Sequence, residues 1–300
     1  FRWWPVLELS NPAVRRVLVL VGPRVLDLGV FHLTMLATTN LASRLGAGSV
    51  SALEWGWHAM QLPETVIGTS LGLVAFPTMA ELAARRDLDG LRRTLGETLR
   101  TVIALSAPAS LALILLGRPL LELLYQRGAF DARATDAVYG ALCCYALGLM
   151  GHASLELAAR AFFARQDTVT PLLIASGSAA LNIGLGVLLM TPLGHVGLAL
   201  ANSVAVSAEV LFLLLILRGR LRGVEGRQIL RAFGKVLVAT LLMGLAIGVG
   251  LAVSQHIGAS ALGKVLVAGT AGGLTYLGAA IQLRLAPLQH LPQAVTLLRQ

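Results

Sequence analysis

Polar side chains follow one face of the first apolar segment of the chain. Arg24, Asp27, Thr34 and Thr38 are separated by steps of three, seven and four residues, and these steps return to the same side of a helix with 3.6 residues per turn. Arg24 and Asp27 either form a simple ion pair one turn apart or belong to a stripe that lines a solvated cavity. An arginine on such a stripe can donate paired hydrogen bonds to an anionic ligand.

The next apolar segment repeats this pattern. Glu54, His58, Gln61 and Thr65 follow steps of four, three and four residues, and Pro63 is expected to kink the helix that carries them. His58 is either a packing residue or a functional group that titrates near neutral pH. We expect this face to line a cavity near Arg24 and Asp27.

Later segments carry further polar residues in steps of four or seven. They are His152, Glu156 and Arg160, followed by His195, Asn202 and Glu209. A carboxylate at membrane depth either binds a proton or a cation or serves as a hydrogen-bonded structural contact. Both interpretations stay open for Glu156, whereas a structural role is favoured for Glu209. Asn182 and Asn202 complete the candidate cavity residues.

The sequence contains no signature of a catalytic or metal site. Asp87 and Asp89 stand between arginines without the further carboxylates that would hold Mg²⁺ on a diphosphate. Phosphate-binding loops, HExxH and nucleophile elbows do not occur. Cys143 and Cys144 are adjacent, so they indicate neither a disulfide framework nor a metal site. We therefore expect no enzyme activity, no metal and no cofactor, and we leave open whether H⁺ or Na⁺ is a coupling ion.

These residues lie in segments that are almost free of charge. Asp, Glu, Lys and Arg do not occur in residues 101–117, 137–155, 168–208, 236–255 and 265–283. About 20 apolar residues span the hydrocarbon core of a bilayer. Hydrophobic residues make up 56% of the chain and charged residues 13%, and the mean hydropathy is +0.76. Because the apolar residues do not alternate with polar ones, the pattern favours an all-α polytopic membrane protein over a barrel.

Hydropathy and turn signals predict eight membrane-spanning helices. Their expected ranges are 13–43, 50–83, 97–117, 132–165, 169–190, 194–218, 229–253 and 261–284. Turns are expected at Gly46-Ala47-Gly48, Gly117-Arg118-Pro119, Thr170-Pro171, Thr191-Pro192 and Gly223 to Gly226. We expect a six-helix unit in residues 1–218 and two additional helices with the C-terminal end in residues 219–300.

The basic residues are divided unequally between the two sides of these helices. Eighteen Lys and Arg residues flank one side and five the other, with only Arg24 inside a span. Cytoplasmic loops carry the excess of Lys and Arg, so both ends of the chain are predicted to be cytoplasmic. The net charge of +9 is therefore a topology signal, and we expect no nucleic-acid partner.

Four stretches of the chain resemble a known family. They are residues 11–45, 60–77, 145–171 and 194–205, and the most specific piece is FARQDTVTP at Phe163 to Pro171. These stretches are similar to the lipid II flippase family (MurJ/MviN) of the multidrug/oligosaccharidyl-lipid/polysaccharide exporter superfamily. Arg165 and Asp167 look like the cytoplasmic loop motif of that family.

The resemblance implies a fourteen-helix exporter-type fold, of which this chain would be the second six-helix lobe and the final helix pair. It implies transport of an undecaprenyl-diphosphate-linked peptidoglycan precursor across the bacterial plasma membrane, with membrane lipids and the missing N-terminal lobe as partners. His58 occupies a place where many members carry a cavity arginine, and Arg24 could supply the missing charge. The alternatives are a polysaccharide-lipid or drug exporter of the same superfamily, or an inert membrane scaffold.

The charge asymmetry generates a prediction about topology. A cysteine placed beside Arg127 should react with a membrane-impermeant maleimide added outside the cell, whereas a cysteine beside Arg222 should react only after the membrane is opened. The reverse labelling pattern would show that the orientation is wrong.

Overall fold

The computed structural model describes residues 12–128, 130–221, 223 and 225–285, and every regular element in them is helical. The two ends of the chain, residues 1–11 and 286–300, lie outside the described residues, and so does the prediction made for them. The elements are α1 (Pro12–Ser43), α2 (Ser49–Glu64), a π-helical turn (Thr65–Thr69), α3 (Ser70–Ala84), α4 (Leu88–Tyr125), α5 (Ala132–Ala164), α6 (Val169–Leu193), α7 (His195–Arg220), α8 (Gly226–His256) and α9 (Ala261–Gln282).

The prediction of eight spans is confirmed for the described part of the chain. Eight helical stretches are long and apolar enough to cross a membrane, and α2, the π-turn and α3 together form one of them, Ser49–Ala84. The expected turn between the first two spans is present. Gly46 has φ 108° and Gly48 has φ 90°, a backbone conformation that glycine adopts without the steric penalty of a Cβ atom.

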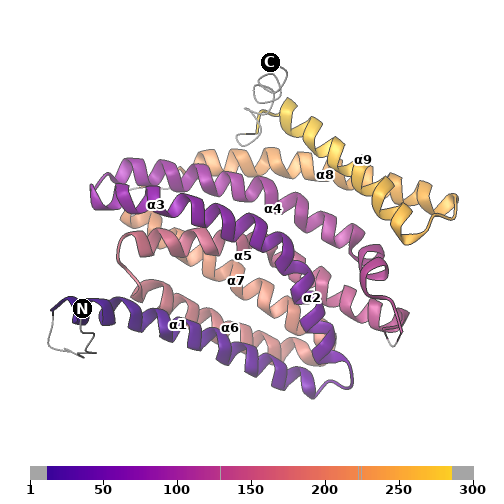
Figure 1. Cartoon of the computed structure of the whole chain (residues 1–300), viewed down its shortest axis with the longest axis horizontal. Helices are drawn as coiled ribbons and strands as arrows, with labels where there is room; N and C mark the ends of the chain where they lie inside the picture. The colour runs from indigo at the N-terminus through magenta and orange to yellow at the C-terminus, as the bar shows by residue number, and fades with distance from the viewer. Residues whose placement is uncertain (1–11, 129, 222, 224, 286–300) are drawn as a thin grey trace, which may run out of the picture.

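The second span bends where Pro63 was expected to kink it. The π-turn begins two residues after this proline, and the ribbon changes direction between α2 and α3 (Figure 1). Proline removes one backbone donor and crowds the preceding turn, so the helix widens locally. The carbonyl of Thr65 accepts the backbone N–H of Ser70 and, at 3.3 Å, the Ser70 hydroxyl as well.

The third span is much longer than the predicted range of 97–117. It begins at Leu88, where the Asp87 side chain accepts a 2.8 Å hydrogen bond from the Gly90 amide, as an N-cap residue does. The polar residues after Asp87 form an amphipathic first part of the helix, which a search for apolar runs does not detect.

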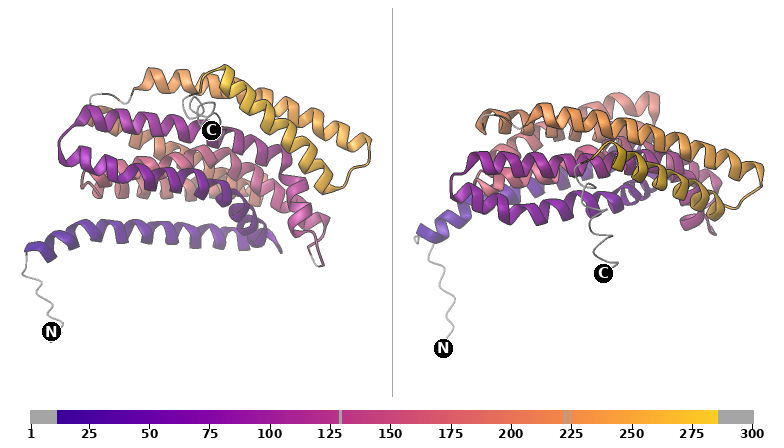
Figure 2. Two further views of the ribbon diagram at one scale, coloured as in Figure 1. Left: turned by 45° about the horizontal axis from the view of Figure 1, so that its top comes forward. Right: turned by 90° about the horizontal axis from the view of Figure 1, so that it is seen from above.

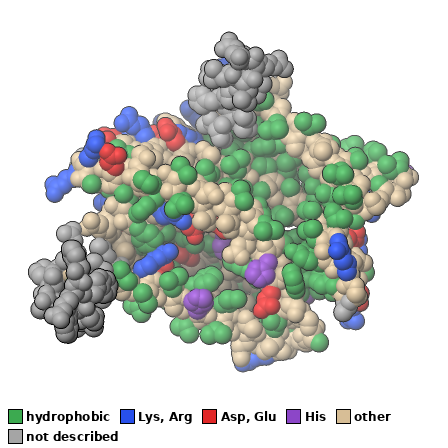
Figure 3. Space-filling view, in the orientation of Figure 1, with side chains coloured by type: hydrophobic (Ala, Val, Ile, Leu, Met, Phe, Trp, Pro, Cys, Tyr) green, Lys and Arg blue, Asp and Glu red, His purple; other side chains and the backbone are tan. Residues whose placement is uncertain are grey.

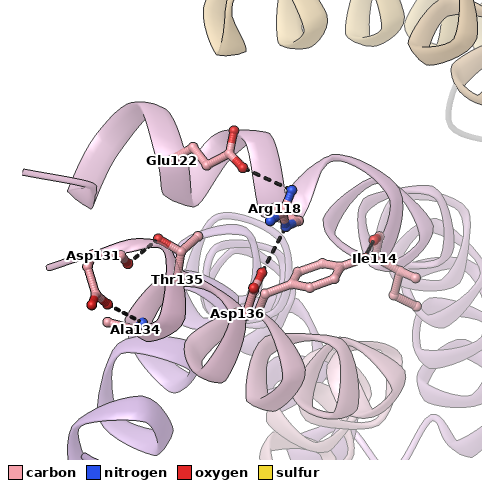
Figure 4. A network of polar contacts seen from close by, with 8 residues as sticks. Ile114, Arg118, Glu122, Asp131, Ala134, Thr135 and Asp136 are labelled. Atoms are coloured by element: carbon pink, nitrogen blue, oxygen red, sulfur yellow. Dashed lines mark hydrogen bonds and ion pairs between the residues drawn. The ribbon is translucent and has the colours of Figure 1, made fainter. Parts of the chain in front are cut away.

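The turn predicted at Gly117-Arg118-Pro119 is wrong, because α4 continues through it to Tyr125. Arg118 is held there by Glu122 at 3.2 Å and by Asp136 of α5 at 2.8 Å (Figure 4). Prolines are tolerated inside membrane helices when neighbouring groups satisfy the freed backbone. The turn predicted at Thr191-Pro192 is also wrong: α6 ends at Leu193, and the chain reverses at Gly194 with φ 59°.

Helix α5 is the centre of the bundle. It packs against α2, α3, α4 and α7, and 56% of its most apolar stretch is buried, the highest share of the eight spans. Small residues permit this: a Cβ atom at Gly148 would lie 2.5 Å from Oγ of Ser203 on α7. The α8 and α9 helices pack together on the outer side of α4, while α1 lies along the opposite edge beside α6 (Figure 2).

The junctions of α3 with α4 and of α5 with α6 lie at the same end of the bundle as the start of α1 (Figure 1). These junctions carry many of the basic residues that the sequence placed on one side. The alternation of spans thus agrees with an even number of crossings. The cytoplasmic assignment of this end stays a prediction.

The close contact at Gly148 generates a stability prediction. Gly148→Leu should destabilise the bundle by about 1–3 kcal/mol, because the added side chain forces α5 away from α7. Gly177→Leu on α6 is the matched control, since nothing lies within 4 Å of a Cβ atom there. Thermal unfolding in detergent measures both variants, and equal midpoints would contradict the packing role of Gly148.

Candidate functional site

A cavity of about 680 Å³ lies among α1, α2, α3, α5, α6 and α7. Its polar and aromatic lining includes Arg24, Asp27, Thr34, Trp57, Gln61, Glu64, His152, Glu156, Arg160, Ser178, Asn182, Asn202 and Glu209. In the space-filling view, charged side chains and histidines gather in the middle of a largely hydrophobic face (Figure 3). Such groups are costly against lipid, so their convergence indicates a wet site within the bundle.

The α1 wall carries both features that its polar stripe suggested. Arg24 Nη1 lies 3.0 Å from Asp27 Oδ2, so the simple ion pair exists. Both residues also line the cavity. The Arg24 guanidinium lies 4.8 Å from the centre of the Phe163 ring on α5, a cation–π contact. Because the Arg24 side chain is half exposed, its remaining donors are accessible to a ligand.

The α5 wall contains a second arginine in a more enclosed position. Arg160 Nη2 lies 2.9 Å from Glu156 Oε2, and its Nε would lie 3.0 Å from a Cβ atom at Gly72. The absence of a side chain at Gly72 on α3 therefore leaves space for this guanidinium. Glu64 lies over Gly68 in the same way and interacts electrostatically with both Glu156 and Arg160. The Glu64 carboxylate thus lies near the Glu156–Arg160 ion pair without pairing with Arg160 itself.

The sequence reasoning missed Glu64. The signal was available, because Glu64 follows Gln61 by three residues and so lies near the same helix face. Pro63, directly before Glu64, predicts a kink but says nothing of where the Glu64 carboxylate points. The structural role favoured for Glu209 is incomplete, since this residue also lines the cavity.

A histidine and a tryptophan close the cavity between α2, α5 and α7. His152 Nε2 is 3.0 Å from Asn202 Oδ1, and the Trp57 ring meets the His152 and Tyr145 rings edge to face, with centroids 5.1 and 5.4 Å apart. Trp57 would be expected from its place near a helix end to be an interfacial aromatic. The structure places it inside the bundle instead, because α2 turns that face toward α5.

The structure brings most of the predicted site residues together. Arg24, Asp27, Gln61, Glu156, Asn182 and Asn202 all line the cavity. Thr38 and His58 do not belong to this lining, and the His58 side chain is exposed. A binding role for either residue stays a prediction. Among the described residues, no group of three His, Cys, Asp or Glu side chains is arranged to hold a metal ion.

The loop motif around Asp167 connects the ends of α5, α6 and α7 at one end of the bundle. Asp167 accepts hydrogen bonds from the Thr170 amide at 3.0 Å and from the Thr170 hydroxyl at 2.7 Å, and it pairs with Arg220 of α7. The Arg220 guanidinium also lies 5.4 Å from the centre of the Phe162 ring. Nη1 of Arg165 is buried without a hydrogen-bond partner among the described residues.

The pKa of Asp167 reflects this network. Partial burial acts to raise the pKa of the carboxyl, but the hydrogen bonds from Thr170 and the charge of Arg220 outweigh it and lower the pKa below its usual value. The carboxylate is therefore favoured by the folded state.

Eight membrane-length helices, five of whose spans line a charged cavity, define the class of polytopic helical membrane proteins. Within that class, the family described as Lipid II flippase MurJ matches residues 1–267. The chain belongs to this family.

Curated relatives of this family are about one third identical to the chain over the aligned residues. The lipid II flippase MurJ of Burkholderia cenocepacia is 34% identical over 216 residues, which is 72% of this chain and 42% of the relative. The probable lipid II flippase MurJ of Rhizobium meliloti is 32% identical over 241 residues, 79% of this chain and 44% of the relative. The chain thus spans less than half the length of these curated relatives.

Solved structures agree on the fold. A lipid II flippase MurJ in an inward closed conformation superposes with a TM-score of 0.73 at 21% identity, covering 93% of this chain and 56% of that one. A transporter of the same superfamily from Pyrococcus furiosus superposes with a TM-score of 0.62 at 16% identity, covering 92% and 66%. The helix bundle is therefore of the superfamily's type.

The lowered pKa of Asp167 generates a prediction about pH. Because its folded-state pKa lies below the unfolded value of about 3.9, its stabilising contribution is present above that value and is lost as the pH falls through the folded pKa. Asp167→Asn should lower stability by about 1 kcal/mol at pH 7 and by much less at pH 3. Thermal unfolding at both pH values measures this difference.

Asp89→Asn is the matched control, since Asp89 is 76% exposed and its ion-pair partner in the described part of the chain is Arg92 of its own helix. It should change stability little at either pH. A loss in Asp167→Asn that is equal at both pH values would contradict the electrostatic role of Asp167.

Proposed function

We propose that this chain is the second-lobe part of a flippase that moves lipid II from the inner to the outer leaflet of the bacterial plasma membrane. The observation that carries the proposal is the polar cavity, with Arg24 and Arg160 among its lining residues, in a member of the flippase family. A large polar headgroup cannot pass about 30 Å of hydrocarbon unaided. A wet cavity that opens to alternate sides removes that barrier without covalent chemistry.

Arg24 is the favoured contact for the lipid diphosphate. It lies on the α1 wall with half of its side chain exposed, and one carboxylate uses only part of its fork of donors. Arg160 is more enclosed and already paired with Glu156. Arg24 can thus take over the charge that many family members place at the position of His58.

The missing N-terminal lobe is the expected protein partner. Only 6% of the most apolar stretch of the span Val21–Ser43 is buried in this chain, although this span carries Arg24 and Asp27. A helix with a polar stripe at membrane depth requires a protein or water neighbour on that side. The first lobe, packed across α1, would complete the cavity, with both ends of this chain in the cytoplasm.

The cavity carboxylates are the proposed place for a coupling ion. Asp27 and Glu156 are paired with arginines, whereas no ion pair of Glu64 or Glu209 is found among the described residues. A proton or Na⁺ could neutralise these two carboxylates when an anionic headgroup enters.

The decisive experiment is a leaflet-accessibility assay for lipid II with the full-length protein. Arg24→Gln should lower flipping at least tenfold, because a charge-assisted hydrogen bond contributes about 1.5–3 kcal/mol. Arg44→Gln is the matched control, since Arg44 is exposed, bonds to Asn40 and does not line the cavity. His58→Gln should have a mild effect, and His58→Arg should preserve or improve flipping.

Normal activity of Arg24→Gln at matched expression would refute the role of Arg24. If the wild-type protein moved no lipid II but exported a polysaccharide lipid or a cationic drug, the exporter alternative would replace the flippase. Absence of any transport, with normal folding, would favour the inert scaffold.

A further inference from the structure

A proline in the middle of α4 leaves one backbone carbonyl without its helical donor. Pro108 has no N–H, so it cannot bond to the carbonyl four residues before it, that of Ala104. An unpaired backbone acceptor is costly in a buried apolar setting. The Tyr276 hydroxyl of α9, 172 residues away in sequence, donates to this carbonyl, and both residues are buried. The α9 helix therefore supplies the hydrogen bond that Pro108 removes.

A second polar contact ties the start of α8 to the same helix. Arg100 Nη1 of α4 lies 2.8 Å from Glu225 Oε2 and 2.8 Å from Gln228 Oε1. The side chains of Arg100 and Glu225 are only 13% and 14% exposed. Glu225 has φ 52°, and a Cβ atom at Gly96 would lie 3.0 Å from its Oε2. A glycine on α4 thus makes room for a carboxylate held in an uncommon backbone conformation.

Helices α8 and α9 pack closely against each other over the region between these two contacts. A Cβ atom at Gly250 would lie 2.8 Å from Cα of Ala268, and one at Gly272 would lie 2.4 Å from the Ile247 side chain. The Lys235 ammonium of α8 donates to the carbonyl of Leu283 after α9 at 2.9 Å. The two helices cannot slide past each other without breaking these contacts.

The part of α4 that follows Pro108 also contacts the helix that carries the cavity wall. The Ser110 hydroxyl donates to the carbonyl of Ala146 on α5 at 2.5 Å, and α5 continues to His152 and Glu156 in the cavity. A change in the conformation of α4 around Pro108 would therefore be transmitted to the α5 wall through direct packing.

We propose that α8 and α9 act as a brace for α4 at the hydrogen bond that Pro108 interrupts, with the Tyr276 hydroxyl and the Arg100–Glu225 pair as its two fastening points. The brace holds α4 against α5 and so keeps the cavity wall in place. Tyr276 and Arg100 are positioning residues that do not contact the transported molecule. The effect on transport rests on the proposed function, whereas the structural effect does not.

Hydrogen exchange of the full-length protein in nanodiscs tests the first fastening point. Tyr276→Phe should speed exchange of the α4 amides around Pro108 about fivefold, while the amides of α6 keep their rates. Tyr139→Phe is the matched control: its hydroxyl also donates to an α4 carbonyl, that of Ile114 at 2.7 Å, but Arg118 four residues later has an N–H for the same acceptor. The proposal is overturned if Tyr276→Phe exchanges like the wild type or like Tyr139→Phe.

A charge swap tests the second fastening point. Arg100→Glu and Glu225→Arg should each speed exchange at the start of α8 at least tenfold, because each leaves like charges together in a buried position. The double variant Arg100→Glu/Glu225→Arg should recover most of the wild-type protection. A double variant that is no better protected than the single ones would contradict the ion-pair role.

The transport assay separates this proposal from the flippase proposal. Faster exchange in Tyr276→Phe, together with reduced lipid II movement, supports both proposals. If Tyr276→Phe exchanges faster but the wild-type protein moves no lipid II, the result supports the brace and removes the flippase. Normal exchange in Tyr276→Phe removes the brace whether or not lipid II is moved.

Discussion

The cost of placing a polar group in hydrocarbon organises this molecule. Water cannot reach the middle of a membrane span, so each charge and each broken backbone bond needs a protein partner or a wet cavity. Arg24 forms an ion pair with Asp27 and Arg160 with Glu156, and His152 is hydrogen-bonded to Asn202. All six residues face a single cavity. The exposed surface of the same helices is dominated by large hydrophobic side chains, as expected next to lipid.

The same constraint governs the prolines. Pro63 precedes a π-turn, and the Ser70 hydroxyl adds a hydrogen bond to the Thr65 carbonyl, which also accepts from the Ser70 amide. Pro108 is accommodated because Tyr276 reaches the carbonyl that the proline leaves unpaired. At Pro108 a side chain from a distant helix thus supplies the hydrogen bond that the interrupted span lacks. Interrupted helices near a cavity give the bundle places where it can bend. The pairing of α8 with α9 restrains α4 in the proposed brace.

Small residues decide where charged side chains can lie. Gly72 leaves space for the Arg160 guanidinium, Gly68 for the Glu64 carboxylate and Gly96 for Glu225. A methyl group at any of these positions would meet a charged side chain at 2.8–3.0 Å. Glycine in these helices therefore serves the polar sites as well as the close approach of helices that is usual in membrane bundles.

The sequence by itself determined the class of fold, the number of spans and the polar faces of the helices. These depend on hydropathy and on a period of 3.6 residues, which are local properties. The loop around Asp167 was also recognisable from its residues alone. Tertiary structure decided how the faces meet: it placed Trp57 and Glu64 in the cavity, left His58 and Thr38 outside its lining, and carried α4 through Gly117-Arg118-Pro119. Local signals could not reveal this, because a proline ends a helix unless a distant donor such as Tyr276 or a neighbouring span compensates for it. That compensation depends on which helices pack together.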